Sequence, residues 1–253
     1  MVVDLQKAGF GKRIIAAIFD GILLSIIAVG VATLLSSVLG YDGYVQSVND
    51  IYAEYEAEYG VEFQISTQEY NALSEEQLEN YNAAYQALIA DEEVNYYYNM
   101  LINLTMIIIT FGVLIGVLAV DFAIPLFLGN GQTLGKKIFG IGVMHADALK
   151  VNNLQLFARA VLGKFAIELM IPLNIIMMIF FNGIGISGVI ILGVLLIVEL
   201  VCVAATRTNS FLHDMLAGTV AVDMASQRIF KNRDELIEYK KAAHAEETAK
   251  SDY

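Results

Sequence analysis

The sequence predicts an all-α integral membrane protein with four transmembrane helices and a helical hairpin inserted between the first two. Hydrophobic residues make up 57% of the chain and its mean hydropathy is +0.60, which is typical of helical membrane proteins. Four apolar stretches reach the roughly 20 residues that a helix needs to cross a bilayer. A polar, acidic segment separates the first two stretches and marks the insertion.

The first predicted span, residues 14–39, contains one charged residue, Asp20, and directly follows Arg13. Its apolar run is too long for the hydrophobic region of a signal peptide, and no small-residue cleavage site follows it, so we expect the span to be retained. An ionisable group at membrane depth usually has a partner, a water-filled cavity or a functional role. Two interpretations of Asp20 stand side by side: a cap or partner for another helix, and a group that binds or transports an ion.

The remaining predicted spans are residues 100–128, 161–181 and 186–206. Lys164, Glu168 and Pro172 interrupt the third, so we expect either a shorter span or a partly re-entrant segment there. In the second span, Gly112 and Gly116 form a GxxxG pair, a spacing that permits close helix packing, including packing in a homo-oligomer. Cys202, the sole cysteine, lies in the fourth span, so the chain cannot form an intramolecular disulfide.

The distribution of charge predicts the orientation in the membrane. Residues 41–99 contain 13 acidic residues and no lysine or arginine. The 15 basic residues lie elsewhere: three before the first span, five from Lys136 to Lys164 and seven from Arg207 onward. The positive-inside rule therefore places both termini and the middle loop in the cytoplasm of a bacterial-type cell, with residues 41–99 outside. The net charge of −12 argues against a nucleic-acid partner.

These assignments divide the chain into six segments. They are the cytoplasmic N-terminus with span 1 (1–40), the acidic, tyrosine-rich extracytoplasmic insertion (41–99), span 2 (100–129), a cytoplasmic loop (130–160), spans 3 and 4 (161–206), and a cytoplasmic amphipathic segment with a charged tail (207–253).

The insertion itself has the periodicity of two helices. Apolar and tyrosine residues recur every three or four positions from Tyr44 to Tyr59, and Gly60 then supplies a stop. A second helix begins after Ser74, which with Gln77 fits the capping-box pattern. We expect the two helices to pair as a hairpin.

Eleven of the 13 tyrosines fall in the insertion. Three of them, Tyr96 to Tyr98, directly precede the second span and suit an aromatic belt at the membrane interface. The others favour the core of a small hairpin, and the alternative is a docking surface for another extracytoplasmic protein, because tyrosine supplies contact area at low entropic cost.

The middle loop begins with a glycine-rich run, residues 129–137. It is not a phosphate-binding Walker loop, because the glycine spacing is wrong and Lys137 occupies the place of the required Ser or Thr. Lys136 and Lys137 suit anionic lipid headgroups instead. Residues 138–151 alternate loosely and predict a short hairpin lying on the membrane, and a helix from Asn153 leads into the third span.

After the fourth span, His213 and Asp214 are adjacent. On a helix they point about 100° apart and cannot together hold a metal ion, so we predict no metal site. The chain has three histidines and one cysteine buried in a span, and it shows no nucleophile–base constellation, cofactor motif or catalytic residue. We therefore predict no enzymatic activity and no cofactor.

Three blocks of residues occur in an order that resembles the RDD family of small multispan membrane proteins, which is named for one arginine and two aspartates. They are Gly11-Lys12-Arg13 with Asp20, then Gly131-Gln132-Thr133-Leu134-Gly135-Lys136-Lys137, then Leu212-His213-Asp214 with Ala217-Gly218-Thr219. The resemblance covers roughly residues 8–39 and 120–222, and the acidic segment stands as an insertion.

Carried over by position, the family arginine resembles Arg13, the first aspartate Asp20, and the second Asp214. The family is mostly uncharacterised, has been suggested to transport unknown ligands, and includes members reported as sodium/proton antiporters. Other members resemble accessory or regulatory partners of membrane proteins. The long acidic insertion departs from a minimal transporter and favours a partner-binding role.

The first functional hypothesis is cation/proton exchange or small-solute transport, with Na⁺ or H⁺ bound by carboxylates at membrane depth. By topology, Asp20, Asp121 and Glu199 lie at similar distances from the cytoplasmic side and are expected to meet at one depth. Four spans are few for a pathway, which favours a homo-oligomer. The predicted ion pathway and family motif comprise Arg13, Asp20, Asp121, Glu199, His213 and Asp214.

The second hypothesis is a non-enzymatic regulatory or interaction protein that binds another membrane or extracytoplasmic protein through the acidic insertion. The intramembrane acids would then pair with bases and serve packing, as Glu168 fits Lys164 four residues earlier. Structural or headgroup contacts are predicted for Lys136, Lys137, Arg159, Lys164, Glu168 and Arg207.

Overall fold

The computed structural model describes residues 5–181 and 183–251 and confirms a predominantly helical membrane protein. Four helical stretches are long and apolar enough to span a membrane: Phe10–Val38, Glu92–Leu128, Asn153–Phe180 and Gly185–Ala205. Each begins earlier than the predicted span, because polar turns at the helix ends continue the helix beyond its apolar run. The chain divides into two compact units, residues 1–28 with 113–253, and residues 29–112.

The first and second spans extend across both units. The first is a single helix, α1 (Phe10–Val38). The second consists of α5 (Glu92–Val117), a π-helical segment η1 (Leu118–Ala123) and α6 (Ile124–Leu128). Gly116 lies where a β-carbon would come within 3.1 Å of the Leu24 carbonyl oxygen of α1. The glycine pair in this span therefore includes a position that serves packing within the chain.

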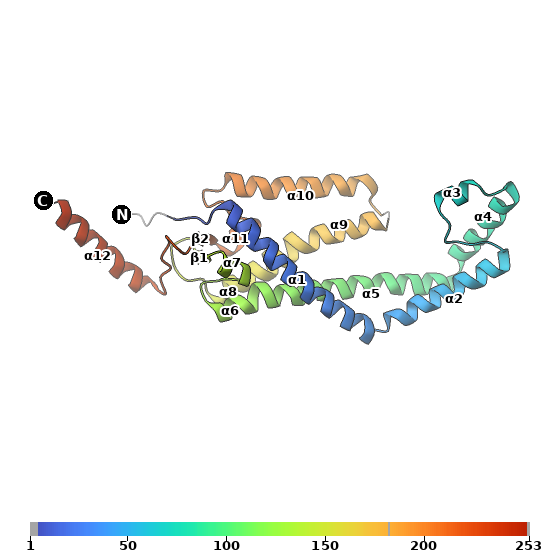
Figure 1. The fold of residues 1–253 in the computed structure, drawn as a ribbon, viewed down its shortest axis with the longest axis horizontal. Coiled ribbons are helices and arrows are strands. Elements are labelled where there is room, and N and C mark those ends of the chain that lie inside the picture. The colour runs from blue at the N-terminus through green and yellow to red at the C-terminus, as the bar shows by residue number, and fades with distance from the viewer. Residues whose placement is uncertain (1–4, 182, 252–253) are drawn as a thin grey trace. The chain divides into compact units, whose positions relative to one another are not determined.

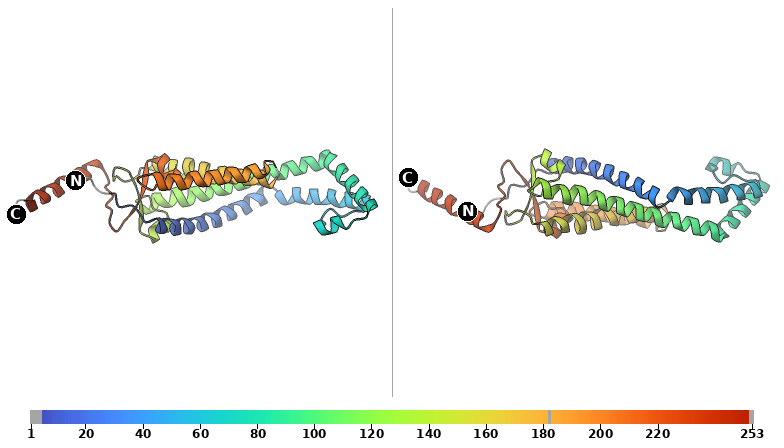
Figure 2. Two further views of the ribbon diagram at one scale, coloured as in Figure 1. Left: turned by 90° about the horizontal axis from the view of Figure 1, so that it is seen from above. Right: turned by 90° about the horizontal axis from the view of Figure 1, so that it is seen from below.

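The third span is one continuous helical stretch, so its predicted interruption does not occur. It runs from α8 (Asn153–Phe157) through a π-helical segment η2 (Ala158–Met170) into α9 (Ile171–Phe180). Pro172 is the second residue of α9, where the π-helical segment gives way to α-helix, and the helix continues across it. The fourth span, α10 (Gly185–Ala205), packs beside α9, as Figure 1 and Figure 2 show.

A small sheet joins distant parts of the first unit. Strand β1 (Ile141–His145) pairs antiparallel with β2 (Thr219–Asp223), which follows α11 (Leu212–Ala217). Residues near the N-terminus add to the other edge of β2, since Lys7 bridges Val222. The predicted hairpin over 138–151 is present only as a turn in which Met144 bridges Lys150. Figure 1 shows the strands beside α11 and α7 (Leu134–Ile138).

The core of this region is buried and apolar. Met144, Val220, Val222 and Phe230 have exposed fractions of 2% or less and pack together. After this core the chain continues as α12 (Arg233–Ser251), a charged helix. The sheet and its core thus hold together three segments, which precede the first span, connect the second to the third, and follow the fourth.

The second unit contains the helical insertion. It comprises α2 (Tyr41–Tyr59), α3 (Thr67–Asn71), α4 (Glu75–Ala90) and the start of α5. Helix α2 ends at Gly60, whose φ of 66° is the left-handed conformation that glycine adopts easily. Ser74 and Gln77 form the capping box of α4. Helices α2 and α4 pack against each other, so the predicted hairpin is present as a structure.

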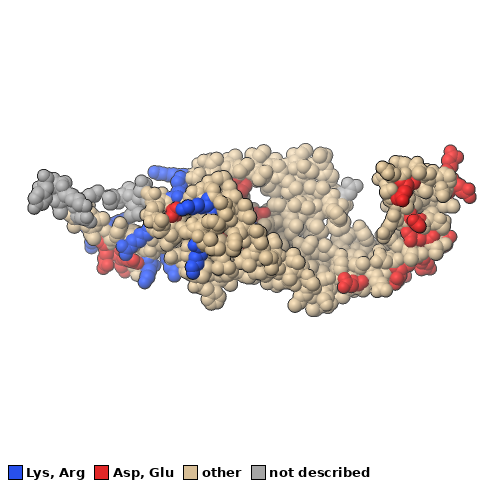
Figure 3. All heavy atoms as spheres, in the orientation of Figure 1, with Lys and Arg blue, Asp and Glu red and all other residues tan. Residues whose placement is uncertain are grey.

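Aromatic rings pack against one another between the helices of the hairpin. Phe63 lies between Tyr52 and Tyr81, with ring centroids 5.7 and 5.8 Å away, and Tyr70 packs edge-on against Tyr81 at 5.3 Å. Tyr55 donates a hydrogen bond of 2.8 Å to Asp91, which raises the pKa of the Tyr55 hydroxyl to about 12. Figure 3 shows only acidic charges on this unit.

Candidate functional site

A charged cavity of about 160 Å³ lies within the first unit. Its lining contains four acidic and four basic side chains, so their formal charges cancel when His213, which also lines it, is neutral. We call this set, with His213, the charged cavity: Arg13, Asp20, Asp121, Lys136, Arg159, Lys164, Glu168 and Asp214.

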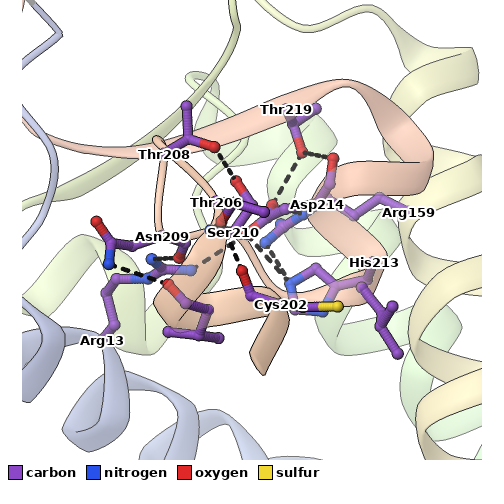
Figure 4. A network of polar contacts seen from close by, with 12 residues as sticks. Arg13, Arg159, Cys202, Thr206, Thr208, Asn209, Ser210, His213, Asp214 and Thr219 are labelled. Carbon is purple, nitrogen blue, oxygen red and sulfur yellow. Dashed lines mark hydrogen bonds and ion pairs between the residues drawn. The ribbon is translucent and has the colours of Figure 1, made fainter. Parts of the chain in front are cut away.

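Asp214, in the first turn of α11, forms ion pairs with both arginines of the cavity. Its Oδ1 accepts from Arg159 Nε at 2.8 Å, and its Oδ2 accepts from Arg13 Nη2 at 3.3 Å. The hydroxyl of Thr219 donates a third bond of 2.9 Å. Figure 4 shows the two guanidinium groups approaching this carboxylate, which is 1% exposed. Burial alone would raise the pKa of Asp214, but the neighbouring basic groups, Arg159 foremost, hold it well below its usual value.

Arg13 has further contacts that fix its orientation. Its guanidinium also donates to the backbone carbonyl of Asn209 and lies 4.8 Å above the ring centroid of Phe211. A planar cation in this position combines charge pairing with a cation–π contact. Arg13 therefore connects the start of the first span to the turn that precedes α11.

Asp20 lies 1% exposed and caps the short helix α7 from outside. Its carboxylate accepts from the Thr133 hydroxyl and, at 2.8 Å, from the Gly135 backbone N–H. Lys136 Nζ lies 3.9 Å from Oδ2. A β-carbon at Gly135 would collide with the backbone carbonyl of Ala16, so glycine is required for this approach. Of the two interpretations of Asp20, the capping of another helix is the one that its hydrogen bonds match.

Asp121 forms an ion pair with a base from the third span. Its Oδ2 accepts from Lys164 Nζ at 2.7 Å, so η1 and η2 meet at this pair. The side chain of Asp121 is 5% exposed and that of Lys164 is 22% exposed. A π-helical turn is wider than an α-helical turn and is frequent at functional sites. The two π-helical segments carry Asp121 and Lys164 to the same cavity.

Lys136 forms a longer ion pair, with Asp20, than the other three bases of the charged cavity form. Its Nζ is 3.4 Å from the Thr133 hydroxyl and further from Asp20. Burial, together with the positive charges of Arg159 and Lys164, lowers the pKa of Lys136 to about 8 against the opposing effect of Asp121. The side chain lines the charged cavity, so of the two predicted roles of Lys136, a structural contact fits better than a contact with lipid headgroups.

His213 connects the cavity to Glu168. Its backbone N–H and ring Nδ1 both lie 2.8 Å from Glu168 Oε1, and Arg159 Nη2 lies 2.9 Å from ring Nε2. A guanidinium can only donate, so Nε2 accepts and the ring proton is on Nδ1. Gly163 permits the close approach of α11, since a β-carbon there would come within 2.6 Å of the His213 β-carbon.

Two of the predicted contacts differ in the structure. Lys164 and Glu168 do not pair along their helix, because the π-helical turns direct one to Asp121 and the other to His213. Glu199 does not share the charged cavity with Asp20 and Asp121. Instead, it lines a separate groove, and its Oε1 accepts the backbone N–H of Leu212 at 3.3 Å.

Three more basic residues with predicted structural or headgroup contacts differ in how deeply they are buried. Arg159 is 5% exposed and belongs to the cavity rather than to a lipid surface, whereas Lys137 and Arg207 are exposed. Among the described residues, no three His, Cys, Asp or Glu side chains are grouped so that they could hold a metal ion. The sequence reasoning missed Thr133 and Thr219 as hydrogen-bond donors, although both belong to the quoted blocks.

The sequence that carries these contacts matches the model of a described family. The model of the RDD family matches residues 7–218. The chain belongs to the RDD family. Neither a curated protein nor a solved structure gives a significant match. In this RDD family protein, the residues carried over as the family arginine and aspartates, Arg13, Asp20 and Asp214, all line one cavity.

Proposed function

We propose that this RDD family protein exchanges a monovalent cation such as Na⁺ for a proton at the charged cavity. The observation that carries the proposal is the balance of four carboxylates and four bases around about 160 Å³ of space. In a balanced cavity, the loss of one proton leaves one uncompensated negative charge. A cation that enters the cavity restores the balance, so binding of the two species is mutually exclusive.

Lys136 is the group that we assign to the proton. Its pKa, lowered to about 8, lies close to physiological pH, whereas a guanidinium does not lose its proton in this range. Below pH 8 the protonated ammonium balances the cavity and excludes a cation. As the pH rises through 8, Lys136 becomes neutral and cation binding becomes favourable.

Asp20 and Asp121 supply the oxygen atoms for the cation. Carboxylate and hydroxyl oxygens are ligands that hard cations prefer, and Thr133 adds a hydroxyl oxygen between Asp20 and Lys136. Both carboxylates are buried, at 1% and 6% exposure, so an uncompensated charge on them is unfavourable without a cation. Glu199 lies outside this route.

The proposed setting is a bacterial-type cell membrane with both termini and the charged cavity on the cytoplasmic side. The distribution of lysine and arginine supports this orientation, and it places residues 41–99 outside. The protein would act without catalysis or a cofactor. A homo-oligomer would supply more helices around the pathway than four spans provide.

Proteoliposomes that contain the purified chain and an internal pH dye test the exchange. A Na⁺ pulse should produce proton flux that rises as the pH increases through about 8, following the deprotonation of Lys136. Lys136→Arg keeps the positive charge but cannot release its proton, so it should abolish the flux while the protein stays folded. Lys137→Arg, at an exposed neighbouring position, is the matched control and should keep it. Absence of flux in the wild type, or unchanged flux in Lys136→Arg, would overturn the proposal.

A second candidate is a regulatory protein that binds another membrane or extracytoplasmic protein through the insertion. The observation that favours it is the folded hairpin of α2 and α4, with capped helices, an aromatic core and an acidic surface without lysine or arginine. Deletion of residues 44–91 should then abolish co-purification of a basic partner and preserve the four spans. An unchanged set of co-purified proteins would count against this candidate.

A further inference from the structure

A second hollow in the first unit differs in character from the charged cavity. It has a volume of about 380 Å³ and lies among residues of η2, α9, α10 and the start of α11. Seven of its nine lining residues are apolar, and the other two are Glu168 and Glu199. We call it the apolar groove, lined in addition by Ile167, Pro172, Leu192, Leu195, Leu196, Phe211 and Leu212.

The two carboxylates of the apolar groove have unequal partners. Glu168 accepts the backbone N–H of His213 and also pairs with the imidazole ring of His213. Glu199 accepts one backbone N–H, from Leu212, through Oε1, and within residues 5–181 and 183–251 no basic side chain pairs with it. The other oxygen of Glu199, Oε2, accepts no hydrogen bond. Among the same described residues, every fully buried side-chain oxygen has a hydrogen-bond partner, so Oε2 is not fully buried.

Because Glu199 lies in a membrane span, a negative charge on this unpaired oxygen is energetically unfavourable. Glu199 is the only charged residue of α10, whose other residues are largely exposed apolar side chains such as Leu196, which is 62% exposed. A carboxylate inside a membrane span usually pairs with a cation or faces a pathway. Within the described residues, the bases of the charged cavity form their ion pairs with Asp20, Asp121 and Asp214 rather than with Glu199.

We propose that the apolar groove binds lipophilic organic monocations, with Glu199 neutralising the positive charge and the leucines of α10 covering the apolar body. The groove falls in the size range of small-molecule sites, roughly 300–1,000 Å³. The negative charge of the carboxylates favours a cation. A metal cation such as Na⁺ needs several oxygen ligands, which the apolar lining does not supply, so the groove favours an organic cation. A zwitterionic lipid headgroup brings a phosphate that Glu168 and Glu199 repel.

This site differs from the proposed exchange site, although Glu168 and Phe211 line both hollows. Asp20, Asp121 and Lys136 do not line the apolar groove, and Glu199 does not line the charged cavity. Lys136→Arg should therefore abolish exchange and leave binding in the groove intact. The two proposals can fail independently.

Binding of tetraphenylphosphonium to the full chain in phosphatidylcholine nanodiscs tests the inference. The wild type should bind it saturably, and it should bind the anion tetraphenylborate, which has the same shape, at least tenfold more weakly. Glu199→Gln should weaken phosphonium binding at least tenfold. Glu238→Gln, which removes an exposed carboxylate from α12, is the matched control and should leave it unchanged.

A second variant keeps the test decisive if Glu199→Gln fails to fold. Leu195→Phe fills the groove while it preserves the carboxylate, and it should also weaken phosphonium binding. Equal binding by the wild type and both variants, or equal binding of the phosphonium and borate ions, would overturn the proposal. Displacement of the phosphonium by added phosphatidylethanolamine would do the same, because it would assign the groove to a lipid headgroup.

Discussion

Charge is used in opposite ways in the two units of this molecule. In the first unit, the carboxylate of Asp214 is buried and paired with bases from α1 and η2. In the second unit, acids such as Glu69 remain at the surface and bond within a few residues of their own position, as Glu69 does with Ser66. Buried charges are strongly destabilising when a partner is lost, whereas exposed ones contribute little. The buried charges of the first unit therefore depend on contacts between distant segments, whereas acids such as Glu69 in the second unit depend on local ones.

The largest effect is expected from Asp214→Asn. The substitution keeps the shape of the side chain but leaves Arg13 and Arg159 buried without a counterion, which should cost about 3–5 kcal/mol. Denaturant unfolding of the purified protein in detergent, followed by circular dichroism, measures the loss. Asp147→Asn, at a side chain that is 61% exposed, is the control and should change stability little. Equal losses in the two variants would contradict the dependence of the first unit on its buried charges.

Acid should destabilise the first unit more than the second. The pKa of Asp214 is lower in the folded chain than its ordinary value of 3.8, so its stabilising effect is complete above that value and is lost as the pH falls below it. In the second unit, the Tyr55 hydroxyl lowers the pKa of Asp91, but this carboxylate is at the surface. Hydrogen exchange compared at about pH 3 and pH 6, after correction for intrinsic rates, should show protection lost in β2 and α11 before α4. The reverse order would contradict the comparison.

A smaller effect should follow from Gly135→Ala. The added methyl group meets the backbone of Ala16 and the carboxylate of Asp20, so α7 must move away from α1 at a cost of about 1–3 kcal/mol. Gly21→Ala tests the same helix pair without a collision, because no atom lies within 4 Å of the added carbon. Thermal unfolding of both variants should show a loss for Gly135→Ala alone. Similar midpoints for the two would show that α7 tolerates displacement.

The smallest effect should come from Ser74→Ala in the second unit. The change removes the hydroxyl that accepts the Gln77 backbone N–H, which should cost about 1 kcal/mol and fray the first turn of α4. Segment-resolved hydrogen exchange detects this fraying. Ser47→Ala, which removes only a bond to a carbonyl within α2, is the control. Fraying that spreads to β1 or α11 would show that the two units are coupled.

The same contrast explains how far the sequence alone could lead. The end of α2 at Gly60 and the start of α4 at Ser74 were predictable, because a left-handed glycine and a capping box act within one helical turn. The four spans followed from apolar length, although polar turns at their ends extended them. Family membership followed from three short blocks of residues.

The partners within the charged cavity were not predictable in this way. The pairing of β1 with β2 joins segments that are separated by three helical stretches, and no local period indicates a partner at that distance. The π-helical segments shifted Lys164 and Glu168 away from the four-residue spacing that suggested their pairing. In the sequence, Lys136 and Lys137 are adjacent lysines that suit lipid headgroups equally, whereas in the structure Lys136 lines the charged cavity and Lys137 is exposed. Only the fold distinguishes the two lysines.

The bond between Arg13 and Asp214 also sets an order of events during synthesis. The two residues are 201 positions apart, so at roughly 5–20 residues per second a ribosome needs on the order of 10–40 s to make the second after the first. Likewise, Asp20 cannot accept the hydrogen bond from Thr133 until 113 more residues have been made. The first span must therefore enter the bilayer with its charges uncompensated, and the last short helix completes the network. A nascent chain that stops before Asp214 carries an unneutralised Arg13, which distinguishes an unfinished molecule from a finished one.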